Sequence, residues 1–185
     1  KIIPTILSRC QIFDFRRITV ADMVSHLQAI CLKENIEAEG DALHIIAQKA
    51  DGALRDSLSL FDQLVSFAGS KLSYKDVIEN LNILDYDYYF KITDDLLAGN
   101  MSAVLLAYNE ILNNGFDGHN FINGLASHVR DLLVCKDEIT LPLLEVSPNV
   151  REKYKVQSRN CAANWLLEKL EVANRADMGF KSSKN

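Results

Sequence analysis

The sequence predicts an all-α fold. Apolar residues recur at the three- and four-residue spacing of helix stripes through most of the chain after Thr19, and capping residues and glycines divide these stripes into segments. Hydrophobic residues make up 48% of the 185 residues and charged residues 24%, with only 3 prolines and 8 glycines, as is typical of a globular chain with few linkers. We therefore expect packed helices that form one domain or two small ones.

One strand signal precedes the helices. Residues 10–15 are β-favouring side chains in partial alternation. One short strand cannot form a sheet alone, so we expect its sheet to belong to upstream sequence and the chain to be a fragment.

Four short helices are predicted next. Thr19 with Asp22 and Ser73 with Asp76 have the spacing of capping boxes, and Gly52 and Gly69 follow apolar stripes. Short connections between the helices indicate a compact helical module. The expected helices span residues 19–35, 42–50, 54–68 and 73–81.

Longer helices are predicted in the rest of the chain. Gly99-Asn100 and Asn113-Asn114-Gly115 are the breaks between them. The segment 137–159, with two prolines, has no clear pattern and is left unassigned. The expected helices span residues 85–98, 101–113, 118–136 and 160–175.

Charge and cysteine usage exclude several classes of protein. The formal net charge of −5 argues against a broad nucleic-acid or membrane surface, although it leaves room for a local basic site. No apolar run is long enough for a membrane span. The four cysteines include no C-x-x-C pair, which favours reduced thiols in a cytoplasmic protein. The four histidines, expected at surface or boundary positions, have no metal-ligand spacing, so we expect no metal site: His26, His44, His119 and His128.

Arg9 is the first candidate functional residue. It lies between Ser8 and Cys10, just ahead of the predicted strand. It is either a solvated cation or a guanidinium held out for bidentate contact with a phosphate.

Arg55 is the second candidate. It falls in the first turn of a predicted helix, where the helix dipole disfavours a cation. Either an acidic neighbour such as Asp56 or an anionic ligand would compensate, and composition does not choose between them.

Together the two arginine clusters resemble one family. Residues 3–15 fit the pattern I-P-T-I-x-S-R-C-Q-x-F-x-F, and residues 52–63 fit G-x-x-R-D-x-x-S-x-x-D-Q. These ordered motifs resemble the gamma/tau subunits of bacterial DNA polymerase III, the AAA+ motors that load sliding clamps. After Leu84 the resemblance rests on helical pattern rather than motifs.

The resemblance implies a role for each arginine. Arg9 would be the arginine finger, reaching in trans the ATP of an adjacent subunit, and Arg55 would be the sensor 2 arginine, contacting ATP phosphates in its own subunit. Ser8, Cys10, Gly52 and Asp56 support the motifs. It also implies three parts: residues 1–17 from the end of the ATPase domain, 18–84 as its helical lid, and 85–185 as a collar that associates subunits and that can continue beyond residue 185 in the family.

The implied function is clamp loading with ATP and Mg²⁺, in the cytoplasm. The chain has no G-x-x-x-x-G-K-[ST] phosphate loop or Walker B strand, so we expect no ATPase activity from these residues alone. The implied partners are further gamma/tau copies, delta, delta prime, the sliding clamp and primed DNA, with no membrane. The alternative is a catalytically inert helical module for protein interaction.

Overall fold

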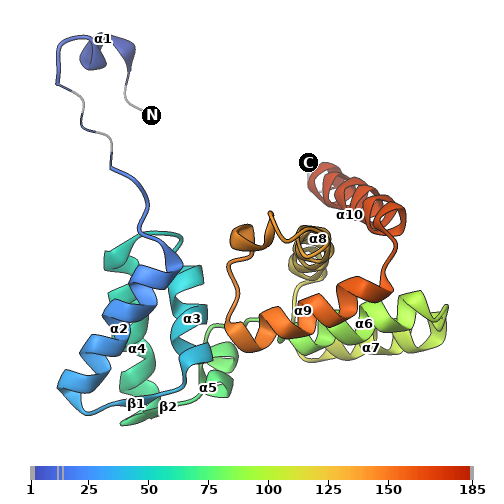
Figure 1. Cartoon of the computed structure of the whole chain (residues 1–185), viewed down its shortest axis with the longest axis horizontal. Coiled ribbons are helices and arrows are strands. Elements are labelled where there is room, and N and C mark those ends of the chain that lie inside the picture. The colour runs from blue at the N-terminus through green and yellow to red at the C-terminus, as the bar shows by residue number, and fades with distance from the viewer. Residues whose placement is uncertain (1–2, 12, 14, 184–185) are drawn as a thin grey trace.

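The computed structural model describes residues 3–11, 13 and 15–183, and it is built almost wholly of helices (Figure 1). The all-α prediction is confirmed, with one small parallel strand pair as an addition. The elements are α1 Pro4–Leu7, α2 Val20–Glu34, β1 Glu37–Ala38, α3 Gly40–Lys49, α4 Leu54–Ala68, β2 Lys71–Leu72, α5 Tyr74–Asn80, α6 Tyr86–Leu97, α7 Met101–Asn113, α8 Gly118–Val134, the 3-10 turn η1 Leu141–Leu143, α9 Pro148–Asn160 and α10 Ala163–Ser183.

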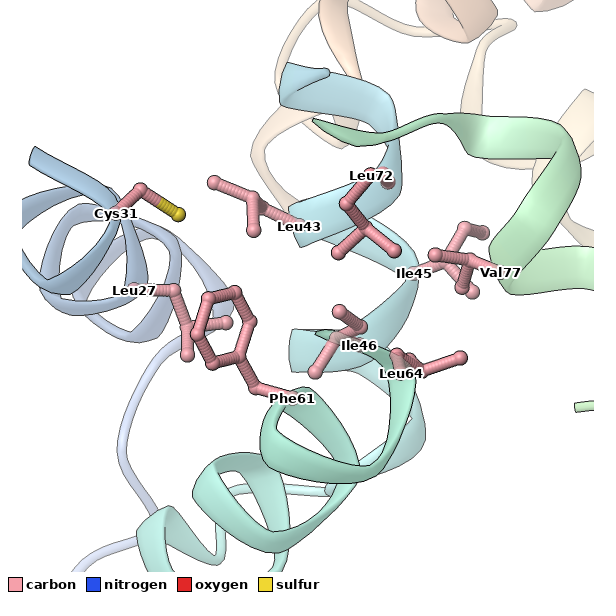
Figure 2. Close-up of a cluster of buried hydrophobic side chains, with 10 residues drawn as sticks. Leu27, Cys31, Leu43, Ile45, Ile46, Phe61, Leu64, Leu72 and Val77 are labelled. Carbon is pink, nitrogen blue, oxygen red and sulfur yellow. The ribbon is translucent and has the colours of Figure 1, made fainter. Parts of the chain in front are cut away.

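The first helical group, α2–α5, forms where the caps predicted it. The Thr19 hydroxyl accepts a hydrogen bond from the Asp22 amide at the start of α2, and Ser73 and Asp76 make a complete capping box on α5. The apolar stripes of α2, α3 and α4 meet in one core, where Leu27, Ile46 and Leu64 are almost fully buried (Figure 2). The predicted stripes therefore correspond to the packed faces.

A parallel pair of two-residue strands closes this group and was not predicted. Glu37 pairs with Lys71 and Ala38 with Leu72, joining the segment after α2 to the segment after α4. Leu72 is fully buried in the same core. Two residues are too few to show an alternating pattern, so periodicity could not reveal these strands.

The strand expected at residues 10–15 was wrong for the residues that the structure describes. Cys10, Gln11, Phe13 and Phe15 are exposed and belong to no strand, and positions 12 and 14 lie outside the described residues. Phe15 is 92% exposed. Strand-forming side chains need a neighbouring strand, and no described segment pairs with them.

The second helical group, α6–α10, contains the helix missed in the unassigned segment. α9 begins after Ser147, whose hydroxyl accepts a hydrogen bond from the Val150 amide, with Pro148 at the first helical position. Tyr154 on α9 is buried in a core with Phe90 and Leu132. α10 packs along α8 and continues beyond the end predicted at residue 175.

Polar contacts and one shared tyrosine join the two groups. The Glu145 backbone carbonyl, in the loop before α9, accepts hydrogen bonds from the side chains of Gln48 and His44 on α3. The Tyr86 hydroxyl donates to Gln48 Oε1 at 3.2 Å, and its ring packs against the cores of both groups. The two groups are thus docked through α3 and the start of α6.

Candidate functional site

Arg9 lies on a segment that stands away from the helical groups. α1 is a single turn, and the Ser8 hydroxyl at its end donates to the Thr5 carbonyl at 3.2 Å. Arg9 and Cys10 follow directly and are exposed. Figure 1 shows α1 lying apart from α2 and from the other helices. The Arg9 guanidinium has no ion-pair partner among the described residues.

Arg55 is exposed in the first turn of α4, and no carboxylate of the described residues neutralises it. Asp56, the neighbour that could have paired with it, is exposed and makes no ion pair with it either. The N-cap residue Ala53 offers no side-chain oxygen to the first amides of α4. A free guanidinium beside uncapped helix amides is an arrangement that suits a phosphate.

The turn before α4 sets the direction of this helix. Asp51 and Gly52 have positive φ values of 47° and 81°, and together they reverse the chain between α3 and α4. Arg55 also borders a groove of about 940 Å³ between α2 and α4, with Ile30, Leu58 and Val65 in its apolar wall. The motif at residues 52–63 therefore supplies both the turn and one wall of a groove.

The structure does not bring Arg9 and Arg55 together into one site. α1 lies well away from α4 (Figure 1), and no described contact joins residues 3–11 to the helical groups. Separation of the two arginines is consistent with guanidiniums that serve different sites.

One contact at the Arg55 turn was missed by the sequence reasoning. Arg17 forms an ion pair with Asp51, and the Ile18 amide donates to the Gly52 carbonyl at 3.2 Å. The sequence gives no signal for this pairing, because Arg16 and Arg17 are adjacent and nothing in the pattern favours one of them.

The expectation of surface or boundary histidines was wrong for His128. This side chain is 1% exposed and lies at the centre of a polar network within the second group. Gln157 Nε2 donates to the Phe90 carbonyl at 2.8 Å and to Asp94 Oδ1 at 2.7 Å, so its Oε1 accepts from His128 Nε2–H. His128 Nδ1 then accepts the Tyr154 hydroxyl proton at 2.9 Å.

Burial controls the protonation of this network. Desolvation lowers the pKa of His128 to about 4, against the opposing effects of Gln157 and Asp94, so the ring is neutral at pH 7. Desolvation also raises the pKa of Asp131, on the same helix, to about 6. These shifts have a structural origin, since His128 is buried between packed helices and the Asp131 side chain is only 17% exposed. The described residues contain no cluster of side chains suited to hold a metal ion.

Comparison with known proteins places these features in a family. Residues 22–70 match the family model described as the ATPase lid domain of a DNA polymerase III clamp loader subunit. Over 181 residues the chain is 34% identical to DNA polymerase III subunit tau of Bacillus subtilis, an alignment that covers 98% of the chain and 32% of that relative. The chain is a DNA polymerase III clamp loader gamma/tau-like protein, and its residues 22–70 form the part that matches the ATPase lid family.

Further matches agree with this family. DNA polymerase III subunit gamma/tau of Mycoplasma genitalium is 39% identical over 126 residues, which is 68% of the chain and 21% of that relative. The chain thus spans about a third or less of these gamma/tau relatives. The DNA clamp loader delta protein of Bacillus subtilis shares the fold, with a TM-score of 0.51 at 13% identity over 90% of the chain and 52% of that structure.

Among the helices of residues 3–11, 13 and 15–183, none combines the length and apolarity that crossing a bilayer requires.

Proposed function

We propose that this gamma/tau-family chain is the lid and collar portion of a clamp-loader subunit that uses ATP to place sliding clamps on primed DNA. In this proposal residues 18–84 are the lid, residues 85–185 are the collar, and residues 1–17 end the ATPase domain. The relatives are much longer than the chain, which supports the view that it is one portion of such a subunit.

The unpaired guanidinium of Arg55 is the observation that carries the proposal. The sequence left two options for this cation, an ion pair with Asp56 or an anionic ligand. No described carboxylate pairs with Arg55, and the uncapped amides of α4 add a second group that favours an anion. Arg55 also lies within the stretch that matches the ATPase lid model. These observations support contact between Arg55 and the phosphates of ATP bound to the same subunit.

Arg9 is proposed to act on the ATP of a neighbouring subunit. Its guanidinium is exposed and unpaired among the described residues, on a segment that projects from the helical groups. A guanidinium aimed at the γ-phosphate stabilises the charge that develops in the transition state of phosphoryl transfer. The segment that carries Arg9 lies apart from α2–α5, the proposed lid of the same chain. This position supports contact between Arg9 and ATP bound to another subunit.

ATP and Mg²⁺ would be held mainly by residues outside this chain, because its sequence has no phosphate loop. What the chain offers to the nucleotide is the Arg55 guanidinium and, in trans, that of Arg9. Mg²⁺ would neutralise charge on the phosphates when it is bound.

Association through the collar is supported by apolar side chains on the surface of α7. Leu105 and Leu106 are 64% and 70% exposed, and Met101 lies one turn before Leu105 on the same helix. Exposed apolar side chains in a row favour contact with another protein surface. The proposed partners are further gamma/tau copies, delta and delta prime.

Substitution of Arg9 in the full-length protein, assembled with its partner subunits, tests this function. Arg9→Ala should lower ATP turnover on the order of 10³-fold while ATP binding persists, because only transition-state stabilisation is lost. Arg9→Lys should also be impaired, because an ammonium lacks the planar fork of donors. Arg16→Ala is the matched control, since Arg16 is exposed on the same segment and has no ion-pair partner within the described part of the chain. Normal turnover by the Arg9→Ala assembly would refute the arginine-finger role.

Substitution of Arg55 separates the proposal from its alternative. Arg55→Ala should weaken ATP affinity or ATP-dependent clamp opening, whereas a catalytically inert interaction module would assemble and load clamps unchanged after substitution of Arg9 or Arg55. Unchanged nucleotide affinity together with unchanged clamp opening would contradict the sensor 2 role.

A further inference from the structure

The segment that carries Arg9 is fastened to the first helical group at one place. Arg17 pairs with Asp51, and the Ile18 amide donates to the Gly52 carbonyl at 3.2 Å. We name these four residues the root clasp: Arg17, Ile18, Asp51 and Gly52. The clasp thus joins the base of the Arg9 segment to the turn that leads directly into the Arg55 helix, α4.

The backbone of the turn is shaped for this contact. A Cβ added to Gly52 would lie 2.5 Å from Arg17 Cβ and 3.2 Å from Arg17 Cα, so only glycine lets the two backbones approach this closely. Asp51, with φ of 47°, occupies the left-handed region, which aspartate tolerates better than most residues. Both residues of the turn therefore suit the clasp as well as the turn itself.

Residues on the N-terminal side of the clasp have no other support among the described part of the chain. The hydrogen bonds of residues 3–10 are all within that segment, and every described residue from Ile3 to Arg17 is exposed. Among the described residues, the clasp is therefore the contact that relates the base of the Arg9 segment to α4.

We propose that Arg17 and Asp51 are positioning residues that couple the Arg9 segment to the lid. Asp51 and Gly52 lie immediately before α4, the helix that carries Arg55. A movement of the lid that shifts Arg55 relative to the ATP of its own subunit therefore also shifts the base of the segment from which Arg9 reaches the ATP of the adjacent subunit. This inference rests on the proposed function, in which both arginines contact ATP. It adds the mechanical link between them.

The ion pair of the clasp is weak enough to break and re-form when the lid moves. Arg17 and Asp51 are 73% and 74% exposed, and ion pairs at such positions change a conformational population by at most about five-fold. The close approach at Gly52 does not depend on charge. Breaking the ion pair should therefore loosen the segment by a small factor, whereas a side chain at Gly52 should displace it.

Amide exchange at Ile18 measures the clasp without any nucleotide. In the 185-residue chain we expect Arg17→Gln and Asp51→Asn each to speed exchange of the Ile18 amide by up to about five-fold, and the double variant to add little more, because both remove one interaction. Asparagine keeps the left-handed conformation at position 51. Arg17→Lys should restore protection, and Arg16→Gln should leave it unchanged. Additive effects of the two substitutions, or no effect of either, would overturn the clasp.

A glycine pair tests the close approach. Gly52→Ala should displace the segment, whereas Gly115→Ala is a matched control, since Gly115 has a similar φ of 84° and nothing within 4 Å of an added Cβ. Spin labels on the exposed Cys10 and on Ser66→Cys in α4 report the distance between the segment and the lid, after Cys135→Ser. A distance distribution changed in Gly52→Ala but not in Gly115→Ala supports the clasp, and equal distributions in both contradict it.

Turnover of the assembled full-length protein tests the coupling itself. Arg17→Gln should lower turnover by up to about five-fold, with Arg17→Lys and Arg16→Gln near wild type. If Ile18 exchange responds but turnover does not, the clasp forms without positioning Arg9 and the inference fails. If Arg9→Ala turns over normally, the proposed function fails instead, whatever the exchange measurements give.

Discussion

The buried network around His128 predicts a loss of stability in mild acid. His128 is neutral and buried; it accepts a hydrogen bond from the Tyr154 hydroxyl and donates one to Gln157. Burial holds its pKa at about 4 in the folded chain, against 6.5 for an unhindered histidine. Because the folded pKa is the lower one, the unfolded chain takes up the proton first. The contribution of neutral His128 to the free energy of unfolding is therefore fully present above pH 6.5 and is lost as the pH drops toward 4.

The size of the effect follows from the two pKa values. Each pH unit between them costs about 1.4 kcal/mol. Protonation of the unfolded chain should thus remove about 2 kcal/mol of unfolding free energy by pH 5 and about 3 kcal/mol by pH 4. This is a large share of the stability of an ordinary domain.

Asp131 acts with the opposite sign in the same range of pH. Burial raises its folded pKa to about 6 from 3.8, so its contribution to stability is complete below pH 3.8 and is lost as the pH rises through 6. The two groups partly compensate between pH 4 and pH 6 in the wild-type chain. Asp131→Asn removes the compensation and should expose the full acid destabilisation by His128.

Urea unfolding of Asp131→Asn at several pH values measures the His128 effect. The unfolding free energy should drop by about 2 kcal/mol between pH 7 and pH 5, and a further His128→Gln substitution should flatten this dependence. Proton NMR of the His128 ring supplies a direct check in the wild type. A ring that titrates near pH 6.5 in the folded chain would refute the reasoning.

Three further predictions concern stability. Gly124→Ala should destabilise the chain by about 1–3 kcal/mol in urea unfolding, because the new Cβ would lie 2.0 Å from the buried Tyr89 hydroxyl, while Gly179→Ala, with nothing within 4 Å, should be neutral or stabilising by up to about 1 kcal/mol. Ser147→Ala should cost about 1 kcal/mol and fray the start of α9 in amide exchange, and protection there equal to wild type would contradict the capping role. Gln48→Leu should cost about 1 kcal/mol and speed exchange across the contact of the two helical groups, and an unchanged exchange pattern would show that the contact does not depend on it.

The helices were the predictable part of the fold because their signals are local. Thr19 and Ser73 cap α2 and α5 as their spacing with Asp22 and Asp76 indicated, and the Met101 start of α7 follows directly from the Gly99-Asn100 break. α9 was missed although Ser147-Pro148 carries a start signal. Its mean hydropathy is low, and its buried positions include Gln157 and Ser158, so no apolar stripe marked it.

The parts that failed depend on partners distant in sequence. β1 and β2 exist through pairing between segments 34 residues apart, and the burial of His128 depends on Tyr154 and Gln157 in the missed helix. At the candidate site, the motif spacing located Arg9 and Arg55. Only the structure shows that Asp56 does not pair with Arg55, because the orientation of neighbouring side chains is not encoded in the spacing. Arg17 carried no signal at all, because its partner Asp51 is fixed by the tertiary fold.

The junction of the two helical groups has an evolutionary consequence. At position 145 it is the main-chain oxygen, not the carboxylate, that receives Gln48 and His44. Every amino acid provides that oxygen. Related chains can therefore vary the residue at this position and still keep these hydrogen bonds between the two helical groups. For these two hydrogen bonds the constraint falls on positions 44 and 48 of α3, where the side chain must be able to donate a hydrogen bond.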